Sequence, residues 1–363
     1  MKMKKMILRY LLLSFIVINT AMANEPEKNR VVSPKIIGGI NSTIQKWPWM
    51  AALVRASETN ANGFFCGGAL IAERWVLTAA HCVEELNPND FKVILGQDAL
   101  NNLQGEILSV SRLVIHPRYD TYSLFNDLAL VQLSSSTQIQ PLQILDKESL
   151  QNLPGKEAIA LGWGDTTANS NHFVPPNILQ QVSLPIISNE ICRYTANIST
   201  KMICAGLEEG GQDTCVGDSG GPLVVFDKTS NHWRHTGITS FGIADECGQA
   251  GFYGVYTRSP EYQDFIKETV CTAADRPTSP QLTLSIKGQT IRAEWTQPNK
   301  AKGYHLYYAP YPAIQPNFSS RDMNTHQGLT VVLAKGYAFY VAIRAYNGNC
   351  YSELSNIENF RVR

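Results

Sequence analysis

Residues 213–222 read Asp-Thr-Cys-Val-Gly-Asp-Ser-Gly-Gly-Pro, and this stretch is the most informative in the 363-residue chain. It places one hydroxyl, that of Ser219, inside a glycine-rich turn. Glycines let the backbone turn sharply, so that its N–H groups can point at whatever the serine attacks. A serine hydroxyl is a weak nucleophile by itself, so such a turn needs a base within hydrogen-bond reach.

Two upstream segments offer a base and a carboxylate. Residues 77–82 read Leu-Thr-Ala-Ala-His-Cys, and the small residues before His81 leave room to pack and aim its imidazole. Residues 125–130 read Phe-Asn-Asp-Leu-Ala-Leu, which places Asp127 at the head of an apolar strand. Such a carboxylate can hold the imidazole in one tautomer and stabilise its charged form. Each residue alone is more often structural than catalytic, but the order His81, Asp127, Ser219 favours a catalytic site.

Together these motifs resemble the trypsin/chymotrypsin family of serine proteases. The chain order His, Asp, Ser is that of chymotrypsin and differs from the orders in subtilisin and the α/β-hydrolases. The resemblance covers about residues 36–271, roughly two thirds of the chain. It implies an all-β fold of two six-stranded barrels, and short apolar runs between turn residues agree with it. A terminal helix is predicted over residues 260–270, where apolar residues share one face.

The resemblance assigns a role to each of these residues. His81 is the general base, Asp127 orients it and Ser219 is the nucleophile, while the N–H groups of Gly217 and Ser219 form the oxyanion hole. The alternative is a non-catalytic adhesin or binding protein on a protease scaffold. The complete triad argues against that alternative, because a degenerate protease usually has one member replaced.

The resemblance also implies a specificity pocket. The residue six positions before the nucleophile lies at its base, and here it is Asp213. A buried carboxylate is costly unless a cation pairs with it, so we expect cleavage after Arg or Lys. Ser240 and Gly242 resemble the family's pocket-edge strand, with Phe241 where Trp is usual. Gly242 and Gly254 keep the walls open for a long side chain.

Residues 34–39 read Pro-Lys-Ile-Ile-Gly-Gly and resemble the activation site of trypsin-like zymogens. Cleavage after Lys35 frees the amine of Ile36, which in the family pairs with the acid before the nucleophile, here Asp218. A buried amine and carboxylate need each other in a low dielectric, and their pairing orders the oxyanion-hole turn. The alternative is a strand that merely enters a turn. Since Lys35 itself suits the Asp213 pocket, self-activation is open to the chain, and no other activating protease is identified.

The N-terminus reads as a targeting segment. A basic start, an apolar run at residues 11–18 and Ala-Met-Ala at residues 21–23 predict a signal peptide over residues 1–23. Residues 24–35 then form the propeptide, and the product is secreted, either outside the cell or into a periplasm. The alternative is a membrane anchor, but the apolar run is too short to span a bilayer comfortably.

Eight cysteines fit an oxidising compartment. The resemblance implies the pairs Cys66–Cys82, Cys192–Cys204 and Cys215–Cys247. Cys271 and Cys350 remain, and an even count in a secreted chain favours a fourth bond between them. We therefore predict that Cys271–Cys350 clamps the C-terminal part to the protease; bonds to other molecules are the alternative.

The composition limits the classes of binding partner that we expect. The chain has 31 basic and 31 acidic residues, which gives no reason to expect nucleic acid or an anionic membrane as a partner. We expect protein or peptide substrates and a monomer. There is no Cys-x-x-Cys pair, and Gln97 replaces the acid of a known trypsin calcium loop, with only Asp98 and Glu106 nearby. No metal and no cofactor are therefore expected.

The C-terminal quarter has a different pattern. Residues 272–280 form a Pro-containing linker, and apolar residues then alternate with polar ones over residues 281–363, which predicts half-buried strands. This part resembles a small β-sandwich of the fibronectin type III kind, with Trp295 as its core aromatic. The tyrosines at 304, 307 and 308 also suggest a sugar site, but core packing and ordinary strand surface is the stronger interpretation.

Overall fold

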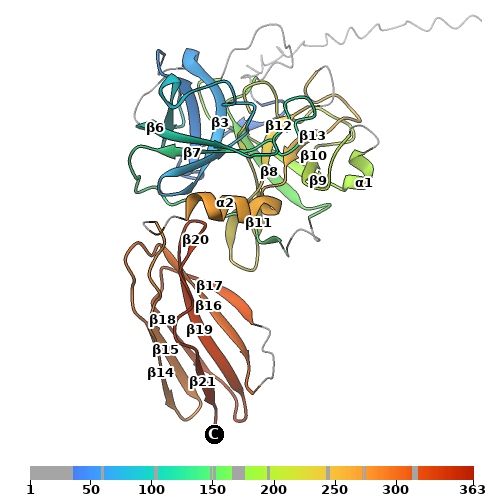
Figure 1. Cartoon of the computed structure of the whole chain (residues 1–363). Coiled ribbons are helices and arrows are strands. Elements are labelled where there is room, and N and C mark those ends of the chain that lie inside the picture. The colour runs from blue at the N-terminus through green and yellow to red at the C-terminus, as the bar shows by residue number, and fades with distance from the viewer. Residues whose placement is uncertain are drawn as a thin grey trace, which may run out of the picture. The chain divides into compact units, whose positions relative to one another are not determined.

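The computed structural model of the chain describes residues 36–363 apart from 59–60, 102–104, 148, 150–152, 166–175, 194–196, 243–245, 272, 274 and 313–317. The predicted signal peptide, the propeptide and Lys35 lie outside the described residues. Strands make up most of the regular structure, and helices are short and few (Figure 1). In the described part of the chain, no helix has the length and apolar character needed to cross a membrane.

Residues 50–133 contain the strands of a closed six-stranded barrel. Nearly every residue of its strands β2 to β5 is buried, because one face lines the barrel interior and the other is covered by neighbouring segments. The strands in order around the barrel are β2 (Met50–Arg55), β3 (Phe64–Ala72), β4 (Trp75–Thr78), β7 (Ala129–Leu133), β6 (Glu106–Ile115) and β5 (Phe91–Leu95).

A second ring of six strands follows. Strand β8 pairs with both β9 and β11, which closes the ring, and the short β1 (Ile40–Asn41) adds to β9. Gly237 lets this barrel fill its centre, because a Cβ there would lie 2.9 Å from the Cβ of the fully buried Tyr256. The strands are β8 (Glu157–Gly162), β9 (Gln180–Ile187), β10 (Met202–Ala205), β11 (Pro222–Asp227), β12 (His232–Phe241) and β13 (Gly254–Thr257). The predicted pair of six-stranded barrels is confirmed.

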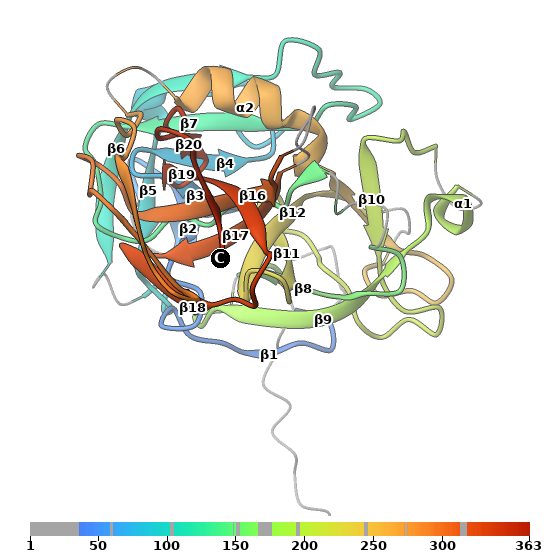
Figure 2. The ribbon, with the colours of Figure 1, turned by 90° about the horizontal axis from the view of Figure 1, so that it is seen from below.

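Short helices lie between and after the barrel strands in the sequence. The helix predicted over residues 260–270 is present as the 3-10 turn η4 (Ser259–Tyr262) followed by α2 (Gln263–Val270). Ile266 and Val270 of α2 are fully buried in the same apolar cluster as the first barrel, and Figure 2 shows α2 alongside β7. The others are η1 (Ala61–Gly63), η2 (Pro88–Asp90) and α1 (Asn189–Cys192).

The C-terminal strands form two sheets that share one apolar core. The first has the order β14-β15-β18, and the second has the order β17-β16-β19-β20 with β21 also on β19. Trp295 of one sheet meets Tyr304 of the other edge to face, with ring centroids 5.9 Å apart. The strands are β14 (Leu282–Lys287), β15 (Thr290–Trp295), β16 (Gly303–Pro310), β17 (Ser319–Asn324), β18 (Gly328–Val332), β19 (Ala338–Asn347), β20 (Cys350–Tyr351) and β21 (Glu358–Arg361).

Strand β16 departs from the half-buried pattern expected of it. Tyr304 and Leu306 face the sandwich core, but His305 on the opposite face is buried as well. Tyr307 shares the face of His305, and its ring centroid is 6.3 Å from the imidazole. The three tyrosines therefore do not form one surface cluster, which removes the basis for a sugar site built from them.

Candidate active site

The loop that carries Ser219 packs against the first barrel. The backbone N–H of Gly67 in β3 donates to the Ser219 carbonyl over 2.8 Å. Gly220 has a φ of +77°, and a Cβ there would lie 2.2 Å from Thr78 Oγ1 and 2.5 Å from the Gly67 carbonyl oxygen. Residue 220 must be glycine because its backbone has a positive φ and because a Cβ would clash with Thr78 and Gly67. The glycine therefore allows the Ser219 loop to approach the end of β4.

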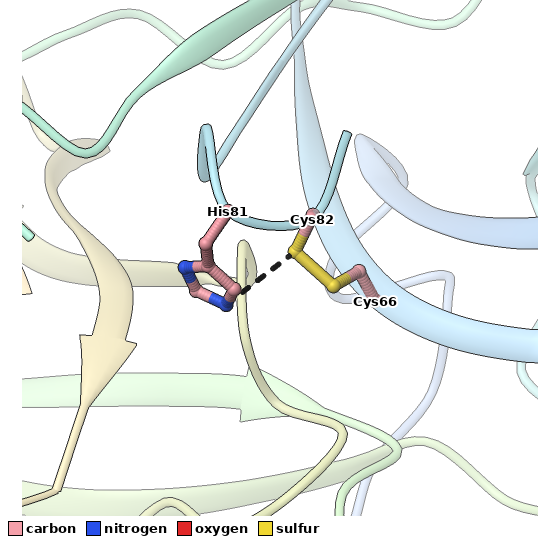
Figure 3. A group of neighbouring side chains, drawn as sticks. All are labelled: Cys66, His81 and Cys82. Atoms are coloured by element: carbon pink, nitrogen blue, oxygen red, sulfur yellow. Dashed lines mark hydrogen bonds between the residues drawn. A yellow bond between two sulfur atoms is a disulfide. The ribbon is translucent and has the colours of Figure 1, made fainter. Parts of the chain in front are cut away.

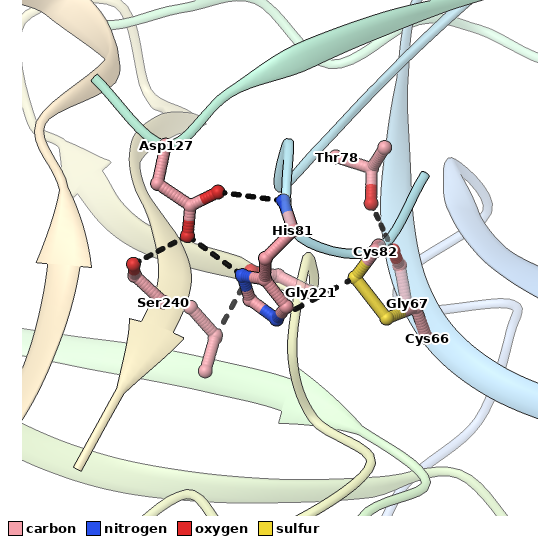
Figure 4. Close-up of a disulfide and its surroundings, with 9 residues drawn as sticks. Cys66, Gly67, Thr78, His81, Cys82, Asp127, Gly221 and Ser240 are labelled. Atoms are coloured by element: carbon pink, nitrogen blue, oxygen red, sulfur yellow. Dashed lines mark hydrogen bonds and ion pairs between the residues drawn. A yellow bond between two sulfur atoms is a disulfide. The ribbon is translucent and has the colours of Figure 1, made fainter. Parts of the chain in front are cut away.

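His81 lies three residues after the end of β4 and is fixed by Asp127. Asp127 Oδ2 accepts from His81 Nδ1 over 2.8 Å, and Oδ1 accepts from the His81 backbone N–H over 3.0 Å (Figure 4). Asp127 is fully buried, whereas the His81 side chain keeps about a quarter of its surface exposed (24%). The two bonds set both the ring orientation and the nitrogen that carries the proton.

The second barrel also holds Asp127. Ser240 Oγ donates to Asp127 Oδ2 over 2.5 Å, and Thr257 Oγ1 donates to the Asp127 carbonyl oxygen over 2.8 Å. The sequence placed Ser240 only at the pocket edge, so its contact with Asp127 was missed (Figure 4). Nothing in the sequence marked Thr257, because a threonine in a strand has no signature of such a contact.

Ser219 and His81 lie in neighbouring loops but are not bonded. In the described part of the chain, Ser219 Oγ makes no hydrogen bond to His81 Nε2; that nitrogen lies 3.8 Å from Cys82 Sγ instead (Figure 3). The two loops are tied through Gly67, which bonds Ser219 and adjoins Cys66, the disulfide partner of Cys82. Catalytic hydrogen bonds are often long without substrate and tighten when it binds.

Cys66, His81 and Cys82 bring three potential ligand atoms within 4.8 Å of one another (Figure 3). The two sulfur atoms are joined to each other in a disulfide. Because the thiolate is the form that binds metal, these residues do not fit a metal centre.

Two backbone N–H groups beside Ser219 are unbonded among the described residues. Asp218 N donates to the Cys215 carbonyl over 2.9 Å, and Gly220 N donates to the Thr239 carbonyl over 2.8 Å. The N–H groups of Gly217 and Ser219 make no such bond in this stretch, and Gly217 adopts a φ of +94°. Strand β12 thus anchors the loop while leaving two donors next to the hydroxyl.

Asp218 is a fully buried carboxylate, and no cationic side chain pairs with it among the described residues. Its oxygens accept from Gly164 N over 2.8 Å and from Cys215 N over 2.9 Å. A Cβ at Gly164 would lie 2.3 Å from the carboxyl carbon, so this glycine makes room for the group. Burial, with a smaller contribution from the nearby Asp213, raises the pKa of Asp218 to about 7 in spite of the two backbone bonds.

The segment after Lys35 lies beside this carboxylate's loop. The Ile36 side chain is fully buried in the apolar cluster of the second barrel. The Ile37 carbonyl accepts from Asp213 N over 3.1 Å, which joins this segment to the loop that carries Ser219.

Asp213 has its carboxylate close to Gly254. Its carboxylate is buried and accepts from Thr214 N over 2.8 Å and Gly248 N over 3.1 Å. A Cβ at Gly254 would lie 2.9 Å from Asp213 Oδ1, while one at Gly242 would meet nothing within 4 Å. Burial raises the pKa of Asp213 to about 6, and no cationic side chain pairs with it among the described residues.

Four disulfide bonds are present in the structure, and each joins two cysteines that were paired from the sequence. Three lie among the barrels, and the fourth connects the end of α2 to strand β20. They are Cys66–Cys82, Cys192–Cys204, Cys215–Cys247 and Cys271–Cys350.

Comparison with known proteins agrees with this architecture. The family model described as Trypsin matches residues 36–266, which run from the buried Ile36 into α2. Trypsin II-P29 of Gallus gallus is 35% identical over 246 residues, a match that covers 65% of this chain and 89% of that protein. Since the match spans more than half of the chain and both barrels, the chain belongs to the trypsin family of serine proteases.

Proposed function

We propose that the chain is a secreted, trypsin-like serine endopeptidase that cleaves proteins and peptides after Arg or Lys. The observation that carries this proposal is the His81–Asp127 pair, bonded over 2.8 Å and held from both barrels, beside the loop of Ser219. That arrangement supplies a base, its buried orienting acid and a nucleophile in neighbouring loops.

The proposed chemistry is acyl transfer to Ser219. The hydroxyl attacks the peptide carbonyl while His81 Nε2 takes its proton, and Asp127 stabilises the imidazolium. The unbonded N–H groups of Gly217 and Ser219 receive the oxyanion; one such donor typically contributes about 10²–10³ in rate. His81 then gives the proton to the leaving amine, and water hydrolyses the acyl-enzyme by the same route.

Asp213 supports the choice of basic substrates. It is a buried carboxylate with no cationic side chain paired to it in the described chain. An arginine or lysine side chain would supply the missing cation, whereas an acidic one would add a second negative charge. Gly254 leaves room next to the Asp213 carboxylate, and a Cβ at Gly242 would meet nothing within 4 Å. We propose that Asp213, these two glycines and Ser240 form the substrate-binding pocket.

We propose that the chain is made as a zymogen and activated by cleavage after Lys35. Asp218 supports this, since it is buried, has a raised pKa and faces no cation among the described residues. The freed amine of Ile36 would provide that cation and lower the pKa of the carboxyl group. The ion pair would also fix the turn at residues 217–219, in which the N–H groups of Gly217 and Ser219 are the proposed oxyanion donors.

We propose that the chain is divided into segments as its sequence predicts. Residues 1–23 are a signal peptide, 24–35 a propeptide and 36–271 the protease domain. After the linker at 272–280, residues 281–363 form a fibronectin type III-like domain, which the facing sheets β14-β15-β18 and β17-β16-β19-β21 support. Four disulfides support an oxidising destination.

The test uses chain cleaved after Lys35 and a set of peptide amides that differ only in the residue before the cleaved bond. We expect hydrolysis of the Arg and Lys members and little of the Phe and Glu members. The Ser219→Ala variant, treated identically, controls for contaminating protease. An inactive cleaved wild type would favour a binding protein on a protease scaffold.

A further inference from the structure

The turn between β19 and β20 lies inside the molecule, although hairpin turns normally lie in solvent. Asn347 and Cys350 are each 1% exposed and Asn349 is 5% exposed. Cys350 belongs to the apolar cluster of the first barrel. Gly348 has a φ of +57°, and a Cβ there would lie 2.3 Å from the Ile71 carbonyl oxygen, so the glycine permits the close approach. We refer to residues 347–350 as the hairpin tip.

Asn349 in the hairpin tip bonds two segments of the protease. Its Nδ2 donates to the Ile71 carbonyl over 3.0 Å and to the Leu142 carbonyl over 3.4 Å. Its Oδ1 accepts from the Ile144 backbone N–H over 2.9 Å. Ile71 is in β3 of the first barrel, whereas Leu142 and Ile144 lie in the segment that connects the barrels. One amide side chain therefore satisfies buried backbone groups on both segments.

The connecting segment continues this contact into the second barrel. His235 in β12 donates its backbone N–H to the Gln143 carbonyl over 2.8 Å, and Leu145 N donates to the His235 carbonyl over 2.9 Å. Near its end the same strand carries Thr239, which bonds the Ser219 loop, and Ser240, which bonds Asp127. A continuous series of hydrogen bonds thus runs from β3 through Asn349 to β12.

A second contact reaches β12 directly from the sandwich. Arg234 Nη2 lies 3.2 Å from Asp322 Oδ2 of β17, and the two side chains are only 7% and 1% exposed. Removing one partner of a buried ion pair leaves the other charge uncompensated, so this contact resists separation.

From these contacts we infer that the hairpin tip sets how the two barrels lie against each other, and that Asn349 is a positioning residue for catalysis. The inference rests on the proposed function, in which His81 and Asp127 come from the first barrel and Ser219 from the second. The tip lies outside residues 36–266 that match the family, so the match does not account for it. Loss of the tip's contacts should shift Ser219 relative to His81 while leaving the Asp213 pocket, which lies within the second barrel, intact.

The test compares two asparagine variants of the cleaved, full-length enzyme. Asn349→Ala removes the side-chain bonds to Ile71, Leu142 and Ile144, and it keeps the backbone bonds from Asn349 N to Ile71 and from Leu142 N to the Leu70 carbonyl. Asn356→Ala is the matched control, because Asn356 bonds Leu282 N over 2.8 Å and the Leu282 carbonyl over 2.9 Å, both within the sandwich. Active sites are counted by burst titration, and kcat, KM and Tm are then measured with one small arginine amide.

We expect Asn349→Ala to lower kcat about tenfold with KM nearly unchanged, since a misplacement of ~1 Å can cost ~10² in rate. Asn356→Ala should lower Tm but leave kcat at the wild-type value. Asp322→Asn, which weakens the contact with Arg234, should lower kcat in the same direction by less, and it replaces Asn349→Ala as the test if that variant does not fold.

Two outcomes overturn the inference in distinguishable ways. An active wild type together with wild-type kcat in both Asn349→Ala and Asp322→Asn means that the hairpin tip only anchors the sandwich. An equal fall of kcat in Asn356→Ala means that any loss of sandwich stability has the same effect. A wild type that hydrolyses no peptide refutes the proposed function itself, and the positioning role with it.

Discussion

The buried Asp218 should give the uncleaved chain a pH-dependent stability that cleavage after Lys35 removes. Burial raises the pKa of Asp218 from 3.8 to about 7 in the folded chain. The folded state therefore holds a proton that the unfolded state has released, so stability is full below pH ~4 and falls as the pH rises towards 7. The whole difference corresponds to about 4 kcal/mol, and about 3 kcal/mol of it falls between pH 5 and pH 7.5.

Cleavage should cancel this loss. The protonated Ile36 amine stabilises the ionised form of Asp218, so folded and unfolded states of the cleaved chain carry the same charge there over this pH range. Cleavage adds the Ile36 amine and the Lys35 carboxyl group, which titrate mainly above pH ~7.5 and below pH ~4 and so change the difference little over this range. All other titrating groups are common to both forms. The gap in stability between cleaved and uncleaved chain should widen by about 3 kcal/mol from pH 5 to pH 7.5, or roughly 6–12 °C in Tm.

The assay is thermal unfolding by circular dichroism of the Ser219→Ala protein, which cannot digest itself, before and after treatment with trypsin. Asp218→Asn in the same background is the control. For this variant the difference in Tm between cleaved and uncleaved chain should not change with pH. A gap that stays constant between pH 5 and pH 7.5 in the Asp218 protein would refute the pairing of Ile36 with Asp218.

Three further predictions concern the pocket and the clamp. Asp213→Ser should lower kcat/KM for arginine amides by about 10² or more, because a charge partner is lost, while a small neutral substrate is little affected; equal cleavage of arginine amides by the variant would show that the pocket is elsewhere. In the wild type, kcat/KM for an arginine amide should fall more steeply than that for a neutral amide as the pH drops through about 6, since protonation of Asp213 removes the charge; parallel pH profiles would contradict this. Replacing Cys271 and Cys350 together by Ser should lower the free energy of unfolding in denaturant by about 4–5 kcal/mol, as the bond closes a separation of 79 residues; unchanged stability would contradict a stabilising role for this disulfide.

Much of the fold was predictable from local sequence. The runs that became β4, β5 and β7 lie between turn residues, and the motifs around His81, Asp127 and Ser219 led to the two barrels. The alternation after residue 281 likewise led to strands. These features are encoded within short stretches, where propensity and spacing act directly.

Contacts between distant segments were not predictable in this way. Ser240 bonds Asp127 across 113 residues, and neither residue's neighbours indicate it. His305 is buried on the face of β16 that alternation assigned to solvent. The Asn-Gly pair at 347–348 is typical of an exposed hairpin turn, so nothing marked Asn349 as a buried link to Ile71, which is 278 residues away.

The most direct test of the central claim is covalent labelling of the proposed nucleophile. Wild-type chain, before and after cleavage at Lys35, is treated with a phosphonate ester that carries an arginine-like side chain, and the adduct is mapped by mass spectrometry. Our account predicts one adduct per cleaved chain, on Ser219, and almost none on the uncleaved chain. Absence of an adduct after cleavage, or an adduct on another residue, would contradict it.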